Sequence, residues 1–154
     1  MSVGGMAAAV GKGVFAGAVG TAAMTVSSTV EAKLSQREPS TAPADAAAKV
    51  LGVEPVGDQE KARFSTLVHW GYGTGWGAPR GLLAAAGLPA PFATAAHLGL
   101  VWGSEVVMLP QLDVAPPLWE MAPKSIAIDL FHHFVYALAT GLAYSFLDRS
   151  TARA

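Results

Sequence analysis

Ionisable side chains with helical spacing stand inside the apolar stretch 125–147. Asp129 precedes His132 by three positions and His133 by four, and Tyr136 continues the series. Residues three and four apart share one face of a helix, so this spacing predicts a polar stripe on an otherwise apolar helix. Carboxylates and imidazoles gathered in one place can pass protons or bind a transition metal.

Two other apolar stretches, 64–88 and 92–109, carry polar groups along one side. They are His69, Tyr72, Trp76 and Arg80 in the first stretch and His97, Ser104 and Glu105 in the second. A charge at the centre of a bilayer costs about 2.5–3.5 kcal/mol on insertion scales. We therefore expect Arg80, Glu105 and Asp129 to turn inward and pair, with histidines bridging them because a neutral imidazole both donates and accepts.

The amino-acid composition indicates whether these groups lie in a protein surrounded by water or by lipid. Apolar residues make up 52% of the 154-residue chain and charged residues 14%, against roughly 25% charged in soluble domains. The mean hydropathy is +0.40. This balance is typical of an integral membrane protein with the lipid bilayer as its main partner. The net charge of −1 gives no reason to expect nucleic-acid binding, and the absence of cysteine excludes disulfides and thiolate ligands.

Four stretches are long enough to cross a membrane, which takes about 20 residues. The sequence predicts an all-α, integral membrane four-helix bundle that forms a single transmembrane domain over residues 1–154. The predicted helices cover about 13–33, 64–88, 92–109 and 123–147. The polar loop 34–63 contains a short amphipathic helix, which we expect at the membrane surface. The first and third loops carry six basic residues, and the terminal side carries three or four. This small excess favours a cytoplasmic first loop but leaves the orientation nearly undetermined.

Glycines at four-residue spacing indicate close helix contacts. The candidate helix-packing residues are Gly13, Gly17, Gly71, Gly73, Gly75 and Gly77. Such GxxxG pairs let two helix backbones approach. They serve either contacts within one bundle or contacts between subunits, and we expect a homo-oligomer or a larger membrane complex.

At "HWGYGTGWGAPRGLL" and "HLGLVWGSEVVMLPQLDVAPPLW" the chain resembles the YagU-like group of small bacterial inner-membrane proteins, whose function is unknown. The resemblance spans nearly the whole chain. It implies a compact multi-pass protein of the bacterial inner membrane, and it supplies no catalytic residues.

Three functions remain open from the residues. The first is a relay for protons or a path for a small solute, and its candidate residues are His69, Arg80, His97, Glu105, Asp129, His132, His133 and Tyr136. The second is a metal site with His97, Glu105, Asp129 and either His132 or His133 as candidate ligands, or a haem held by two histidines. The third is a structural or accessory subunit whose polar groups only fix helix register. No nucleophile or soluble-enzyme motif stands out, so we do not expect an enzyme.

Overall fold

The computed structural model describes residues 2–38 and 40–151, and these residues are almost entirely helical, with no strand. The elements are α1 (Val3–Ser35), α2 (Ala42–Leu51), α3 (Asp58–Gly75), α4 (Gly77–Ala85), α5 (Ala90–Gln111), the 3-10 turn η1 (Leu118–Glu120) and α6 (Pro123–Thr151). The predicted all-α class is confirmed. Three helices, α1, α5 and α6, are long and apolar enough to cross a membrane.

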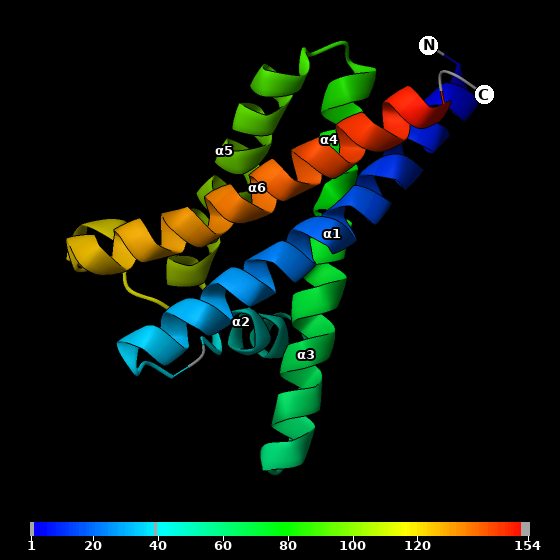
Figure 1. Cartoon of the computed structure of the whole chain (residues 1–154). Helices are drawn as coiled ribbons and strands as arrows, with labels where there is room; N and C mark the ends of the chain where they lie inside the picture. Colours follow the sequence, from blue (N-terminus) through cyan, green and yellow to red (C-terminus); the bar gives the residue numbers. More distant parts are fainter. Residues whose placement is uncertain (1, 39, 152–154) are drawn as a thin grey trace.

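The two longest helices, α1 and α6, lie side by side and antiparallel (Figure 1). Lys12 forms an ion pair of 2.9 Å with Asp148 near the chain termini, and Ser27 contacts His132 toward the other end. Ser2 caps α1 by accepting a hydrogen bond from the Gly5 N–H, so this helix begins ten positions before the predicted start. Its 33 residues span about 50 Å, more than the roughly 30 Å of hydrocarbon in a bilayer.

The second predicted helix, 64–88, is instead two helices that meet at Trp76. Pro79 explains the break, because a proline has no N–H for the Gly75 carbonyl four positions earlier and its ring crowds that carbonyl. The backbone of Trp76 stays in the helical region, so α4 continues in nearly the direction of α3 (Figure 1). Together they cross behind α1 and α6 at a steep angle, unlike a bundle of near-parallel helices.

Glycines bring α1 into backbone contact with α3 and α4. A methyl group added at Gly77 would collide with the carbonyl of Gly13, and one added at Gly17 would collide with the carbonyl of Thr74. Gly73 packs instead against the side chain of Thr21. These candidates therefore serve packing within the chain.

Gly71 and Gly75 differ from these glycines. A Cβ atom at either position would meet nothing within 4 Å, so both face away from the described helices. The prediction that all six candidate glycines pack helices together does not hold for these two within the chain.

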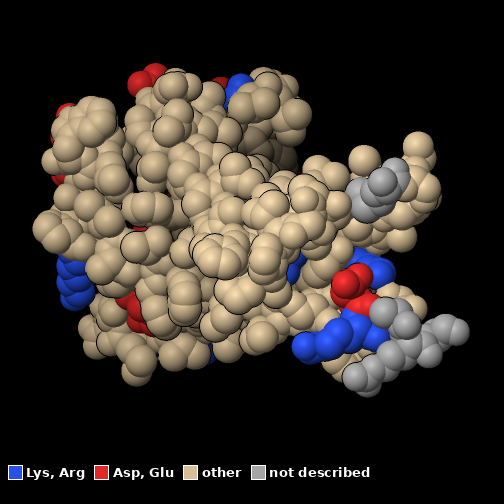
Figure 2. Space-filling model, turned by 90° about the horizontal axis from the view of Figure 1, so that it is seen from above, with Lys and Arg blue, Asp and Glu red and all other residues tan. Residues whose placement is uncertain are grey.

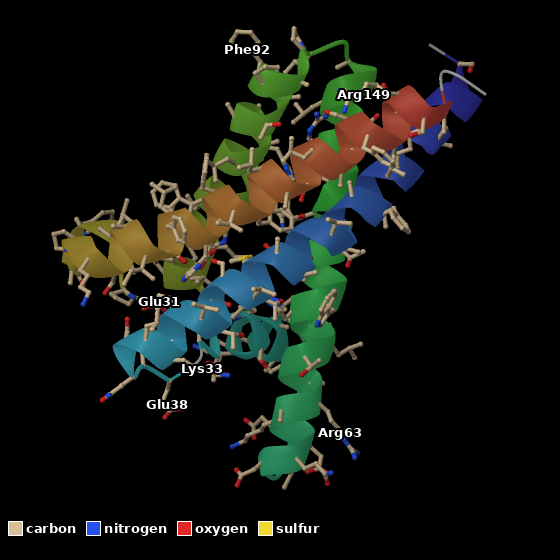
Figure 3. The ribbon with its side chains drawn as sticks, in the orientation of Figure 1. Glu31, Lys33, Glu38, Arg63, Phe92 and Arg149 are labelled. Carbon is tan, nitrogen blue, oxygen red and sulfur yellow. The ribbon has the colours of Figure 1, made fainter. Side chains whose placement is uncertain are left out.

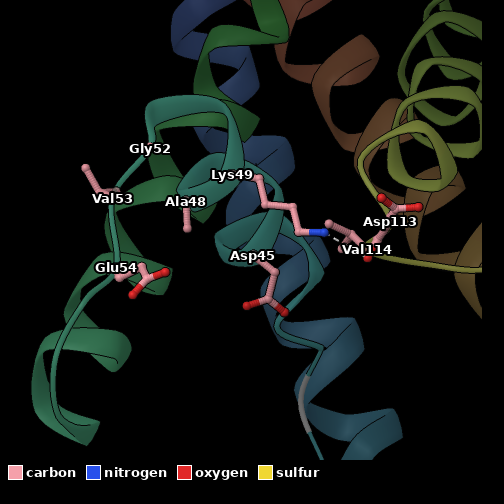
Figure 4. Close-up of a pocket in the computed structure, with 8 residues that line it drawn as sticks. All are labelled: Asp45, Ala48, Lys49, Gly52, Val53, Glu54, Asp113 and Val114. Carbon is pink, nitrogen blue, oxygen red and sulfur yellow. Dashed lines mark hydrogen bonds between the residues drawn. The ribbon is translucent and has the colours of Figure 1, made fainter.

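The short helix α2 is tied to the connection between α5 and α6. Lys49 donates hydrogen bonds to the carbonyls of Leu112 (2.5 Å) and Asp113 (3.1 Å), and a shallow pocket lies beside these groups (Figure 4). Gly52, in the left-handed region with φ 65°, ends α2. The polar first loop is thereby fastened to the same end of the molecule as the third loop.

Apolar side chains cover much of the outer surface. Phe15 on α1 and Phe146 on α6 are 65% and 64% exposed. Charged atoms gather toward the margins of the face shown in Figure 2. Figure 3 shows labelled charged side chains near helix ends, such as Glu31 and Arg149. A surface of this kind suits lipid contact around the middle of the molecule and water at its ends.

Candidate functional site: a polar core along α6

A stripe of polar side chains runs along α6 at steps of three and four residues. Its members are Asp129, His132, His133, Tyr136, Thr140, Tyr144 and Asp148. The five between the two aspartates are buried, whereas the aspartates are partly or fully exposed. The buried side of α6, which meets α1 and α5, thus carries groups able to hold or donate protons over nearly its whole length.

Glu105, Asp129 and His133 form what we call the acid–imidazole cluster, between α5 and α6. The Nε2 atom of His133 lies 2.6 Å from the Glu105 carboxylate, and its Nδ1 atom lies 3.5 Å from the Asp129 carboxylate. The expected contact of Asp129 with the histidine four positions later is therefore present.

Hydrogen bonds around the cluster fix the protonation of its ring. The Nδ1 atom of His133 lies 3.0 Å from the main-chain carbonyl of Asp129. A carbonyl only accepts, so Nδ1 carries a proton. Nε2 then faces Glu105, and this 2.6 Å pair must hold a further proton or a cation between its two lone pairs. Trp102 donates its indole N–H to the second Asp129 carboxylate oxygen at 2.8 Å.

His132 faces a different helix from its neighbour. Successive helical residues point about 100° apart, and His132 accordingly meets α1, where it lies 2.5 Å from the Ser27 hydroxyl and 3.8 Å from the Glu31 carboxylate. Glu31 also accepts a 2.7 Å bond from Arg37. The expected contact of His132 with Asp129 is replaced by this second histidine–glutamate pair.

Two of the predicted core residues bond to main-chain carbonyls around the break between α3 and α4. His97 Nε2 donates to the Trp76 carbonyl at 2.8 Å, and the Tyr136 hydroxyl donates to the Gly73 carbonyl at 2.6 Å. Main-chain groups near a proline in a membrane helix require such substitute partners. His97 and Tyr136 are therefore explained by the backbone that they satisfy.

His69 and Arg80 lie apart from the acid–imidazole cluster. His69 contacts the Thr25 hydroxyl at 2.9 Å. Arg80 is 1% exposed, and its guanidinium carbon lies 4.6 Å from the centre of the Tyr144 ring, within cation–π range. The prediction that Arg80 pairs with Glu105 and Asp129 is wrong, because Tyr144 lies about 22 Å along α6 from Asp129.

The predicted metal ligands are only partly brought together. Within the described residues, the ligand atoms that converge belong to Glu105, Asp129 and His133, all within 4.8 Å of one another. His97 and His132 are held elsewhere, by Trp76 and by Ser27. Of the two alternatives on α6, His133 rather than His132 is therefore the histidine that joins the two carboxylates. Each of the four histidines has a different main partner, so no two of their rings lie together.

Sequence reasoning missed several members of this core. Trp102 stands three positions before Glu105, so helical spacing alone places the indole on the same face. Thr140 and Tyr144 continue the four-residue steps from Tyr136 and were equally accessible to that argument. Ser27 carried no signal of its own, because serine is common in packed membrane helices.

No family model, no curated protein and no solved structure matches this chain. The site is therefore interpreted from its geometry.

Proposed function

We propose that this chain is a small multi-pass membrane protein that relays protons along the polar face of α6. The observation that carries the proposal is the stripe itself. It links the Lys12–Asp148 pair near the termini with the Glu105–His133 and Glu31–His132 pairs toward the opposite end. A relay through a membrane needs exchangeable groups at successive depths, and α6 carries one at nearly every turn.

The unpartnered buried atoms lie along this route. Among the described residues they are Glu31 Oε1, Arg80 Nε and Nη1, His97 Nδ1, His132 Nε2 and Thr140 Oγ1. Buried polar atoms nearly always bond to protein or to internal water. Water molecules at these atoms would shorten the steps between neighbouring side chains, and water-linked side chains are what a proton relay requires.

A fourth membrane crossing by α3 and α4 accompanies the proposal. The first turns of α1 and the last turns of α6 lie at the same end of the molecule (Figure 1), where Lys12 pairs with Asp148, and this requires an even number of crossings. Three apolar helices supply an odd number. The pair α3–α4 follows α1 in antiparallel contact from Gly81 back to Gly73 and thus returns the chain. In the same proposal α2 lies at the membrane surface.

Proton flux into liposomes tests the relay. Purified chain is reconstituted with an internal pH dye, and a potassium gradient with valinomycin drives proton entry. Thr140→Val preserves shape and removes a hydroxyl near the middle of the stripe, where the side chain is fully buried. We expect this variant to reduce the flux at least tenfold relative to the wild type.

Thr66→Val is the matched control, because Thr66 is exposed on α3 and bonds only to the carbonyl of Ala62 in its own helix. It should leave the flux unchanged. Equal flux in the wild type and Thr140→Val, or wild-type flux no greater than in empty liposomes, contradicts the relay. In that case the accessory-subunit interpretation takes its place. The resemblance to YagU-like proteins, the bacterial inner membrane and an oligomeric state stay predictions.

A further inference from the structure

The acid–imidazole cluster has more negative charge than its protein neighbours balance. It holds two carboxylates and one imidazole between α5 and α6. Three basic side chains on or next to α1 and α4 have partners outside the cluster. Arg37 pairs with Glu31, Lys12 pairs with Asp148, and Arg80 stacks on Tyr144. Even with a protonated His133 the cluster keeps one excess negative charge, and a partly buried charge of this kind favours a cation.

The shape of the cluster suits a cation with directional bonds. Donor atoms from three side chains on two helices lie within 4.8 Å of one another. Zinc bonds of about 2.0–2.2 Å to nitrogen and oxygen separate neighbouring ligand atoms by about 3.3 Å. The His133–Glu105 pair, at 2.6 Å, is closer than that spacing, so a bound metal requires the two side chains to move apart.

Two groups outside the ligand set hold it in the arrangement found around metals. Histidine ligands usually donate their second ring N–H to a carbonyl or a carboxylate, and Nδ1 of His133 donates to the Asp129 carbonyl in this way. Trp102 donates to one Asp129 carboxylate oxygen, and the other lies 3.5 Å from Nδ1 of His133, so Asp129 has to turn toward Nε2 to join the ligand set. The His133 side chain is only 8% exposed, so its ring has little freedom to turn away.

An entry path is present as well. The side chains of Glu105 and Asp129 are 27% and 32% exposed, unlike the ring between them. Asp129 follows the first residue of α6, Pro123, by about 9 Å along the helix. The cluster therefore lies near the end of the hydrophobic span, where an ion can arrive from water without crossing the hydrocarbon.

We propose that Glu105, Asp129 and His133 bind one divalent transition-metal ion, with zinc as the best match. One oxygen of each carboxylate and Nε2 of His133 are the protein ligands, and the fourth position faces solvent. Metal binding replaces the proton held between His133 and Glu105. The site goes beyond the relay and does not depend on it.

Calorimetric titration of Zn²⁺ into the full chain in detergent, after removal of metals with a chelator, tests the site. We expect one zinc per chain. Glu105→Gln keeps the size of the side chain and removes a charged ligand, so zinc affinity should fall at least a hundredfold. Trp102→Phe removes the donor that positions Asp129 and should weaken binding about tenfold, with a changed absorption spectrum of bound Co²⁺. Circular dichroism verifies that each variant stays helical.

The second histidine–glutamate pair supplies the matched control. Glu31→Gln combined with His132→Asn removes an equivalent pair from the same molecule and should leave zinc affinity unchanged. The site is overturned by a wild type that binds no zinc, by equal affinity in the wild type and Glu105→Gln, or by loss of binding in the control. Proton flux that fails while zinc binding holds removes the relay and leaves the metal site standing.

Discussion

The molecule has two polar regions, and their side chains have different kinds of partner. Around the break between α3 and α4, His97 and Tyr136 donate to main-chain carbonyls. In the acid–imidazole cluster, Glu105 and His133 meet one another across two helices. The first region is accounted for by the fold, because unsatisfied carbonyls in a membrane are expensive. In the second region the one main-chain contact, from His133 Nδ1 to the Asp129 carbonyl, lies within α6, so satisfying backbone groups does not explain why Glu105 of α5 meets His133.

Mutations around the break should therefore lower the free energy of unfolding clearly, whereas mutations in the cluster should change it little. The most sensitive position is Gly77, where a Cβ atom would collide with the Gly13 carbonyl. Main-chain atoms cannot rotate out of the way, so we expect Gly77→Ala to reduce the free energy of unfolding by about 1–3 kcal/mol. Unfolding in SDS, followed by circular dichroism, measures the loss.

Gly75→Ala is the control two positions away. A Cβ atom there meets nothing within 4 Å, and alanine favours a helix over glycine by about 1 kcal/mol. The variant should be unchanged or slightly more stable. Equal losses at both positions would show that the contact between α1 and α4 is not what holds this region. A loss at Gly75 alone would point to a contact between copies of the chain.

The second prediction addresses a single hydrogen bond in the same region. Tyr136→Phe removes only the hydroxyl that donates to the Gly73 carbonyl. The carbonyl loses this donor in a buried place, and we expect stability to fall by about 0.5–2 kcal/mol. Tyr72→Phe, at a tyrosine that is 45% exposed on α3, should change stability little. Identical effects at the two tyrosines would mean that Tyr136 contributes by packing rather than by satisfying the break.

Helical spacing was sufficient to predict that α6 carries an inward polar stripe, because that follows from the positions of a few residues on one helix. It was not sufficient to predict partners across helices. Adjacent His132 and His133 contact α1 and α5 respectively, and that choice depends on how α6 is rotated against both. Arg80 shows the same limit, since its partner depends on where α4 lies after the Pro79 break.

The spans show a related limit. Of the four stretches predicted from apolar length, three correspond to helices long and apolar enough to cross a membrane, α1, α5 and α6. It did not reveal that the stretch 64–88 divides at Trp76, although Pro79 gives the physical reason. Proline is tolerated in membrane helices when neighbours satisfy the main-chain groups around it. Its effect therefore depends on residues far away in the sequence, such as His97, which donates to the Trp76 carbonyl next to the break.

The smallest expected effect on stability is that of Glu105→Gln in the cluster, and it contrasts most clearly with the effects expected at the break between α3 and α4. Without metal, Glu105→Gln removes one of two nearby negative charges and leaves Asp129 with His133. The lost attraction and the relieved repulsion oppose each other, so we expect the free energy of unfolding to change by less than about 1 kcal/mol. The same SDS unfolding, run after chelator treatment, measures it.

Zinc then separates the cluster from the break region in one experiment. A ligand present at a hundred times its dissociation constant stabilises the folded state by about 2.7 kcal/mol. The wild type and Tyr136→Phe should both gain this amount, because Tyr136 binds a carbonyl and not the metal. Glu105→Gln should gain almost nothing. If metal-free Glu105→Gln is as unstable as Gly77→Ala, the cluster holds the helices together after all, and the distinction between the two regions fails.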